Sequence, residues 1–137
     1  MHVLVVDDNR ELADYAVKFL KVFANHTADV AVSAKEALEL ASEREYGAIL
    51  TEFRLPHQDV GLNLAKSLRD QGFKGLIIGL VSITRTFTVE KMTEMGFNAI
   101  LRKPILEKDM DILKMKPGTV LFEGDDLSYE KNKTPLR

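Results

Sequence analysis

Three carboxylates and one lysine stand where a fold could bring them into one site. Asp7 and Asp8 follow a short apolar run near the N-terminus. Glu52 ends a second apolar run, and Lys103 follows a third. Carboxylates held close together repel one another and resist ionisation unless a cation lies among them. Carboxylate oxygens that leave room for water suit Mg²⁺, and a lysine ammonium suits a phosphate oxygen. The chemistry that these four side chains favour is Mg²⁺-assisted phosphoryl transfer.

Short apolar runs alternate with amphipathic stretches, and this alternation predicts the elements that position the four side chains. The predicted strands cover residues 3–6, 30–32, 48–51, 76–81 and 99–101, each followed by a helix. The last helix is predicted from about Glu107 to Met115, before Pro117. Five such units predict a doubly wound, five-stranded parallel α/β sheet with helices on both faces. Ligands of such sheets bind outside the carboxyl ends of the strands, where the carboxylates and Lys103 lie.

The first predicted helix has an apolar face that we expect to be buried. Its members recur at helical spacing: Leu12, Tyr15, Ala16, Phe19, Leu20 and Phe23. We assign Phe19 and Phe23 to the core. Asp8, followed three residues later by Glu11, is similar to a capping box at the helix start.

Composition excludes several classes of protein. The 137 residues include no cysteine, which excludes disulfides, thiolate metal sites and cysteine nucleophiles. The 19 basic and 21 acidic residues give a net charge of −2, so we expect no nucleic-acid binding through a basic surface. No apolar run approaches the ~20 residues of a membrane span and no signal-peptide pattern is present, so we expect a cytoplasmic protein without membrane association.

Length and composition also predict the domain organisation. At about 100–200 residues per domain, the chain is one domain with a little left over. We expect a domain over residues 1–116 and a C-terminal extension over residues 117–137. Residues 119–122 could add a short strand, and the polar remainder is expected to be largely mobile.

Three segments together resemble the receiver domain of response regulators, the signalling family of two-component phosphorelays. They are Val3-Leu4-Val5-Val6-Asp7-Asp8-Asn9, Ile49-Leu50-Thr51-Glu52-Phe53-Arg54-Leu55-Pro56 and Leu101-Arg102-Lys103-Pro104. They occur in the family's order, and the resemblance covers residues 1 to about 115. It implies the flavodoxin-like (βα)5 receiver fold, with a phospho-acceptor that takes its phosphoryl group from a histidine kinase.

The resemblance also assigns residue roles. Position 52 is the phospho-acceptor, and Asp7 and Asp8 are implied to hold Mg²⁺ beside that carboxylate and the backbone carbonyl of Arg54. Lys103 and a hydroxyl after the fourth strand would contact the phosphoryl group. The peptide bond between Lys103 and Pro104 is implied to be cis.

The chain departs from the family's pattern around this chemistry. Glu52 replaces the acceptor aspartate with a side chain one methylene longer, and in-line transfer is sensitive to displacements of ~1 Å. The hydroxyl position falls on Val81, and on Ser82 only if the following loop is one residue shorter. Ile100 stands where the family has its switch aromatic, and residues 57–61 make a turn one residue longer than usual.

The departures predict an atypical, single-domain receiver-like module that acts through protein–protein contacts. It would work without phosphorylation or as a mimic of the phosphorylated state, with the Glu52 carboxylate reaching toward Lys103. Mg²⁺ binding would then be weak or absent. The partner is expected to be a sensor histidine kinase or another signalling protein, and the chain a monomer or a weak homodimer.

Several alternatives stay open. The first is a phosphorylation-competent receiver that uses Mg²⁺. Glu52 itself could be a natural replacement or an engineered acidic mimic, and the other departures from the family's pattern favour a natural replacement. Each residue also has an ordinary interpretation, because Asp8 could serve only as a helix cap and Lys103 could be solvated. A Mg²⁺-dependent phosphohydrolase is the remote alternative, since phosphatases of the haloacid-dehalogenase type carry Asp-x-Asp after the first strand, where this chain has Asp7-Asp8-Asn9. We therefore do not expect an enzyme.

Overall fold

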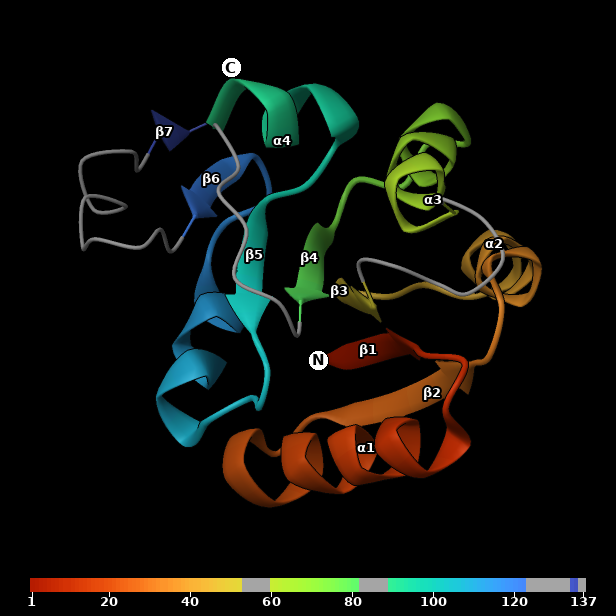
Figure 1. The fold of residues 1–137 in the computed structure, drawn as a ribbon, viewed down its shortest axis with the longest axis vertical. Coiled ribbons are helices and arrows are strands. Elements are labelled where there is room, and N and C mark those ends of the chain that lie inside the picture. The colour runs from red at the N-terminus through yellow and green to blue at the C-terminus, as the bar shows by residue number, and fades with distance from the viewer. Residues whose placement is uncertain (53–59, 82–88, 123–133, 136–137) are drawn as a thin grey trace.

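Seven strands form one sheet in the part of the chain that the computed structural model describes, which is residues 1–52, 60–81, 89–122 and 134–135 (Figure 1). Their order across the sheet is β2-β1-β3-β4-β5-β6-β7. The strands are β1 (His2–Val6), β2 (Thr27–Ala31), β3 (Ala48–Glu52), β4 (Leu76–Val81), β5 (Ala99–Arg102), β6 (Thr119–Phe122) and β7 (Thr134–Pro135). Neighbouring strands are parallel as far as β6, and β7 pairs with β6 in the antiparallel direction. The predicted parallel α/β architecture is confirmed, with a sixth parallel strand beyond the expected five.

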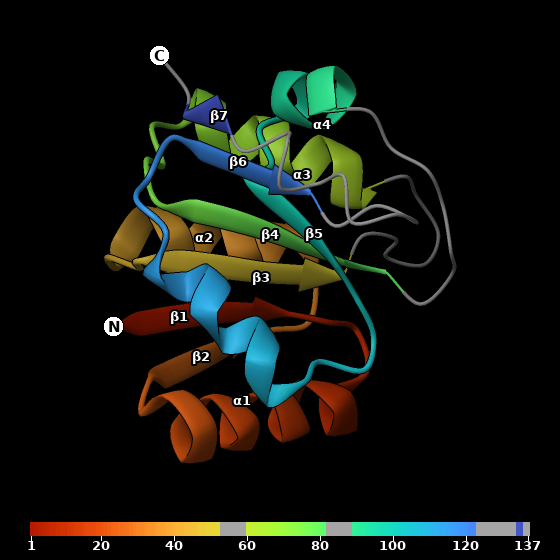
Figure 2. The same ribbon diagram turned by 90° about the vertical axis from the view of Figure 1, so that its left-hand side faces the viewer.

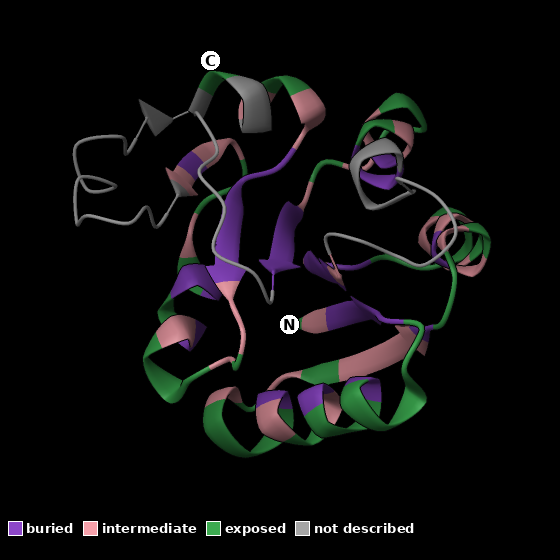
Figure 3. Cartoon of the chain, viewed as in Figure 1, coloured by how far each residue is buried: buried purple, intermediate pink, exposed green. Residues whose placement is uncertain are grey.

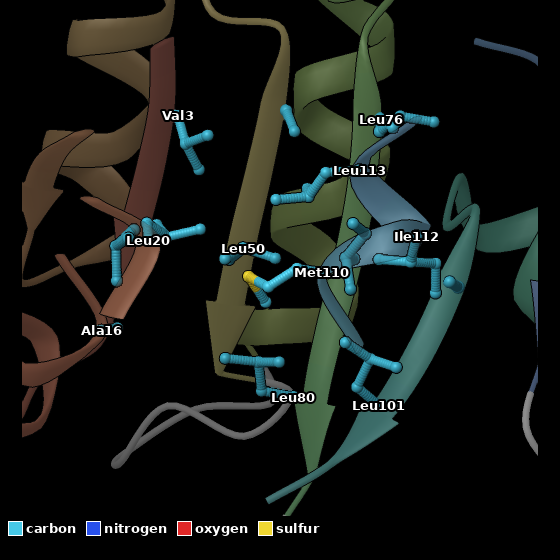
Figure 4. Packing of buried hydrophobic residues seen from close by; sticks show 14 of the residues in the cluster. Val3, Ala16, Leu20, Leu50, Leu76, Leu80, Leu101, Met110, Ile112 and Leu113 are labelled. Carbon is cyan, nitrogen blue, oxygen red and sulfur yellow. The ribbon is translucent and has the colours of Figure 1, made fainter. Parts of the chain in front are cut away.

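Helices cover both faces of the sheet (Figure 2). They are α1 (Arg10–Ala24), α2 (Ala34–Glu43), α3 (Val60–Asp70), α4 (Val89–Met95) and the 3₁₀ helix η1 (Glu107–Lys114). Alternate residues of each strand point to opposite faces, so the chain has two apolar cores. In one core α2 and α3 pack on Leu4 and Ile49, and in the other α1 and η1 pack on Val3 and Leu50 (Figure 4). None of the helices described is long and apolar enough to cross a membrane.

The last helix has 3₁₀ rather than α geometry. Its inward side chains include Met110 and Leu113, which are buried and lie three residues apart. A 3₁₀ helix has three residues per turn, so this spacing places both side chains on one line facing the sheet. Pro117 follows closely and cannot continue a helix.

The buried face of helix α1 coincides only in part with the predicted one, since Ala16 and Leu20 are buried as predicted. Ala13, Ala16 and Leu20 are its buried residues, and Phe19 is only partly buried. Phe23 is 48% exposed, so its assignment to the core is wrong. The small alanine side chains let the helix lie close to the sheet, which turns the larger apolar residues to its flank.

The start of α1 also differs from the prediction. The N-cap residue is Asn9 rather than Asp8, and its side chain accepts a hydrogen bond from the backbone N–H of Leu12 at 3.1 Å. An asparagine at this place satisfies one of the free N–H groups of the first turn as well as an aspartate does.

Asn98 ties three strands together at the end of the sheet opposite to the carboxyl ends of its parallel strands. The side chain is fully buried and accepts from the backbone N–H of Ile77 at 2.8 Å. Its Nδ2 donates to the carbonyl of Thr119 at 2.8 Å, at the start of β6. Arg69 donates to the Asn98 side-chain oxygen at 2.7 Å and to three backbone carbonyls. A single buried amide therefore fixes the spacing of β4, β5 and β6.

The division of the chain at residues 116 and 117 stays a prediction. Residues 119–122 form β6 and extend the parallel sheet beside β5. The segment expected to be mobile lies for the most part outside the described residues.

Candidate functional site

The carboxyl ends of β1, β3 and β5 bring the predicted side chains to one edge of the sheet. The register pairs Val6 of β1 with Thr51 of β3, so Asp7 and Glu52 are the next residues on two adjacent strands. β4 lies between β3 and β5, and the arrowheads of all four strands point to the same side of the molecule (Figure 2). Lys103 follows the last residue of β5 on that side. Residues that are far apart in sequence therefore meet where a parallel sheet binds ligands.

The ammonium of Lys103 lies between two carboxylates. Its Nζ forms an ion pair with Oε2 of Glu52, and it lies 3.7 Å from Oδ2 of Asp7. The side chains of Lys103, Glu52 and Asp7 are only 24%, 13% and 9% exposed. The predicted approach of Glu52 to Lys103 is confirmed, and the pair is more buried than an ordinary surface ion pair.

Backbone contacts orient the groups of this cluster. The second Asp7 oxygen, Oδ1, accepts a hydrogen bond from the N–H of Asn9 at 2.9 Å. The N–H of Lys103 donates to the carbonyl of Val81 at 2.8 Å, which holds the end of β5 against β4. Asn9 thus has two tasks, since it caps α1 and directs the Asp7 carboxylate. The sequence pattern predicts the cap at Asp8 and indicates no site role for Asn9.

Electrostatics set the ionisation of Glu52. Burial raises the pKa of its carboxyl above the usual value, and the hydrogen bond and charge of Lys103 act in the opposite direction. The negative charges of Asp7 and Asp8 raise the pKa further. Lys103 faces the carboxylates of Glu52 and Asp7, and the charge of Asp8 adds to the repulsion at Glu52, so a second cation near this edge would reduce that repulsion.

The residues fit a hydrated magnesium ion in part. Mg²⁺ uses one or two carboxylates and keeps several waters, and Asp7 and the exposed Asp8 supply that kind of oxygen. Within the described residues, no three acidic or histidine side chains form a group that could hold a metal. Glu52 faces Lys103 instead of joining such a group. The backbone carbonyl of Arg54, the other expected ligand, lies outside the described residues. A metal ion at this edge would be coordinated by Asp7, Asp8 and water.

The remaining predicted positions lie around the cluster. Val81 ends β4 with 8% exposure, and Ile100 lies in β5 with 5% exposure. Both belong to the core that α2 and α3 cover. The peptide bond between Lys103 and Pro104 is cis. Ser82 and the turn before residue 60 lie outside the described residues.

Comparison with known proteins identifies relatives of this chain and its fold. The family model described as response regulator receiver domain matches residues 3–114. A response regulator receiver protein of Anaeromyxobacter sp. (strain Fw109-5) is 32% identical over 104 residues, which are 74% of this chain and 42% of that protein. The sensor protein EvgS of Escherichia coli (strain K12) is 29% identical over 117 residues, 83% of this chain and 9% of that protein. The chain thus spans less than half of either relative.

Solved structures show the same fold. The receiver domain of the Francisella response regulator 1452 has a TM-score of 0.68 and 26% identity, with 96% of this chain and 98% of that chain covered. A CheY-like receiver domain from Methylobacillus flagellatus has a TM-score of 0.73 and 26% identity, with coverage of 83% and 96%. Vibrio cholerae CheY4 has a TM-score of 0.73 at 22% identity, covering 82% and 95%.

Proposed function

The chain belongs to the family of response regulator receiver domains, and we propose that it is an atypical member that signals without being phosphorylated. Receiver domains are signalling modules of two-component systems and generally not enzymes. They interact with histidine kinases or phosphotransfer proteins and generally bind Mg²⁺ at the phosphorylation site. The observation that carries the proposal is the ion pair between Glu52, at the acceptor position, and Lys103.

The length of Glu52 supports a role as an internal substitute for a phosphoryl group. Glutamate places its carboxylate about 1.5 Å further from the backbone than aspartate does, one carbon–carbon bond. That extra reach brings Oε2 into contact with the ammonium that the resemblance assigns to a phosphoryl oxygen. The negative charge that phosphorylation would supply to Lys103 is therefore already present.

The same contact disfavours phosphorylation of Glu52. An attacking carboxylate oxygen must be free and in line with the incoming phosphorus atom. Oε2 is paired with Lys103, and the carboxylate is largely buried. Val81, at the end of β4, has no hydroxyl that could donate a hydrogen bond to a phosphoryl oxygen. Both features raise the activation barrier to phosphoryl transfer onto Glu52.

The output of the module is contact with another protein. Two relatives are named as sensor proteins, the sensor protein EvgS and the osmosensing histidine protein kinase SLN1 of Saccharomyces cerevisiae. We propose that a sensor histidine kinase or another signalling protein of this kind is the partner. We further propose that the chain acts in the cytoplasm, has no enzymatic activity, and binds Mg²⁺ weakly if at all, through Asp7 and Asp8.

Intact-mass measurement after incubation with acetyl phosphate and Mg²⁺ tests the proposal. We expect no phosphoryl adduct on the wild-type chain. The matched control is Glu52→Asp, which restores the family's acceptor and withdraws the carboxylate from Lys103, and we expect it to gain the mass of one phosphoryl group. Adding Asp8→Asn to that variant should reduce the adduct by weakening Mg²⁺ binding.

Two results would contradict the proposal. A stable adduct that maps to Glu52 of the wild-type chain would show a phosphorylation-competent receiver. Sustained release of phosphate without a stable adduct would support a hydrolase. Absence of an adduct on Glu52→Asp would leave the proposal standing, and would show that Val81 or its neighbours had lost the phosphoryl contacts as well.

A further inference from the structure

Strand β6 lies on the edge of β5 and is joined to it by a short ladder. The register gives two residue pairs between β5 and β6, whereas β5 and β4 share four. Of Thr119, Val120 and Leu121, Val120 alone is buried, with 1% of its surface exposed. β5 beside it is buried along most of its length (Figure 3). A short ladder and the buried side chain of Val120 therefore anchor this part of the sheet.

The polar groups of β5 that β6 contacts do not need β6 to stay satisfied. The backbone carbonyl of Asn98 accepts from the N–H of Leu121 at 2.7 Å, and Nδ2 of Asn98 donates to the carbonyl of Thr119 at 2.8 Å. Both groups would meet water if β6 left, because β6 covers that edge. The side-chain oxygen of Asn98 would keep its bonds from the N–H of Ile77 and from Arg69. Departure of β6 therefore leaves Asn98 with no buried polar group unpaired, which favours local opening of this edge.

The chain between η1 and β6 has the features of a hinge. η1 ends at Lys114, and Pro117 cannot continue a helix. Gly118 has a φ of +93°, and glycine can leave this conformation for many others without strain. The N–H of Thr119 donates to the carbonyl of Lys116 at 3.1 Å, a bond within the connection that survives movement of β6. A few loop residues of this kind can absorb the backbone rotations of a moving segment.

We propose that β6 is a detachable strap, which turns about residues 116–118 and opens while strands β1 to β5 stay folded. β7 moves with it, because β7 lies last in the sheet and pairs with β6. The open form bares the outer edge of β5, whose free backbone groups are a template for strand pairing. The closed strap blocks that edge. None of these contacts involves Glu52 or Lys103, so the strap is tested separately from the proposed function.

Native-state hydrogen exchange of the full chain compares two amides that meet at Asn98. The N–H of Leu121 bonds to the Asn98 carbonyl and reports the strap, whereas the N–H of Asn98 donates to the carbonyl of Ile77 at 2.8 Å and reports the pairing of β5 with β4. We expect Leu121 to exchange at least about 100-fold faster than Asn98 after correction for intrinsic rates. Urea below the unfolding transition should accelerate Asn98 and leave Leu121 nearly unchanged, because opening of the strap exposes little surface. Equal protection with the same urea dependence would overturn the proposal, since β6 would then leave only on global unfolding.

Two variants assign the exchange to local or global opening. Leu20→Val weakens the other core, which α1 covers, so it should accelerate Asn98 about 10-fold and leave Leu121 unchanged. Val120→Ala weakens the closed strap and should accelerate both amides by the same factor, about 10-fold, because Val120 is exposed in the open strap and in the unfolded chain alike. Acceleration of Leu121 by Leu20→Val, or no effect of Val120→Ala on Leu121, would overturn the proposal.

A disulfide that closes the strap gives an independent measurement, because the chain has no cysteine of its own. Ala99 and Leu121 are register partners on β5 and β6, and neighbouring strands lie within the range of Cα distances that a disulfide can bridge. The double variant Ala99→Cys, Leu121→Cys in its oxidised form should exchange at position 121 at least about 10-fold more slowly than the same variant when reduced, which is the matched control. Equal rates in the oxidised and reduced forms would overturn the opening of β6 as a unit.

Discussion

Replacing Lys103 with methionine removes the charge between Glu52 and Asp7 and keeps an unbranched apolar side chain that is one heavy atom shorter. The two carboxylates then face each other across a largely buried space, with 13% and 9% of their side chains exposed. Removing one partner of a buried ion pair lowers the free energy of unfolding by about 3–5 kcal/mol, whereas an exposed pair contributes about 0–1 kcal/mol. Lys103 itself is 24% exposed, which places the expected loss near the lower end of the buried range, at about 3 kcal/mol.

Urea denaturation of four chains measures this loss and assigns it to the pair. They are the wild type, Lys103→Met, Glu52→Gln and the double variant. Glu52→Gln alone should change the free energy of unfolding by less than about 1 kcal/mol, because Lys103 keeps Asp7 as a partner. The double variant should recover much of the stability lost in Lys103→Met, which gives a coupling energy of about 2 kcal/mol.

The loss caused by Lys103→Met should depend on pH with a definite sign. Burial already holds the pKa of Glu52 above its ordinary value of 4.5, and removing Lys103 raises it further. A carboxyl with a raised pKa in the folded state binds more protons there than in the unfolded chain, so stability falls as pH rises through that interval. The destabilisation caused by Lys103→Met should therefore be small near pH 4 and reach its full size by pH 8.

Two results would refute this account of the pair. A coupling energy below about 0.5 kcal/mol would show that the pair behaves as if it were exposed. A loss that is the same at pH 4 and pH 8 would show that methionine disturbs packing rather than charge. The double variant controls for packing, because it carries the same methionine without the Glu52 charge.

Three further predictions concern other polar groups. Asp29→Asn should cost about 1–2 kcal/mol of unfolding free energy at pH 7, because the hydroxyl of Tyr46 donates to Asp29 at 2.6 Å and lowers the pKa of that carboxyl. The loss should fade as pH drops through the lowered pKa, so urea titrations in which it did not diminish at all between pH 7 and pH 2 would contradict this prediction. Arg69→Met should cost about 3 kcal/mol by removing the hydrogen bonds that Arg69 donates to three backbone carbonyls and to the oxygen of Asn98, which still accepts from the N–H of Ile77. Thermal unfolding within 2 °C of wild type would argue against that role. Mg²⁺ titration followed by NMR should shift the amides around Asp8, and Asp8→Asn should weaken binding about 10-fold; unchanged spectra in the wild type would mean that the acidic pair has a structural role only.

Much of the fold follows from local pattern. The runs that became β1, β3, β4 and β5 are short, largely apolar and end at polar residues, so their carboxyl ends could be located from the sequence. Parallel pairing then places Asp7, Glu52 and Lys103 together without any knowledge of loops, because strand ends share one edge. The approach of Glu52 to Lys103 follows from side-chain length.

Other features depend on tertiary packing. Periodicity showed that α1 has an apolar face, but it could not show which part of that face the sheet covers. Ala13 and Ala16 allow the closest approach, and Phe23 is left on the flank. Asn9 and Asp8 are both good caps, and only the path of the chain into α1 selects between them. The geometry of η1 follows from how Met110 and its neighbours meet the sheet.

The position of β6 determines how far the chain can be shortened in the laboratory. A fragment that ends at residue 116 would remove the carbonyl of Thr119 from the buried amide of Asn98, and the N–H of Leu121 from the Asn98 carbonyl. It would also leave a cavity where Val120 now lies, 1% exposed, in the core. With its edge unpaired, β5 would become a template for pairing with other chains, so we expect such a fragment to aggregate. A fragment that ends at residue 122 keeps these contacts and is the better starting point for expression.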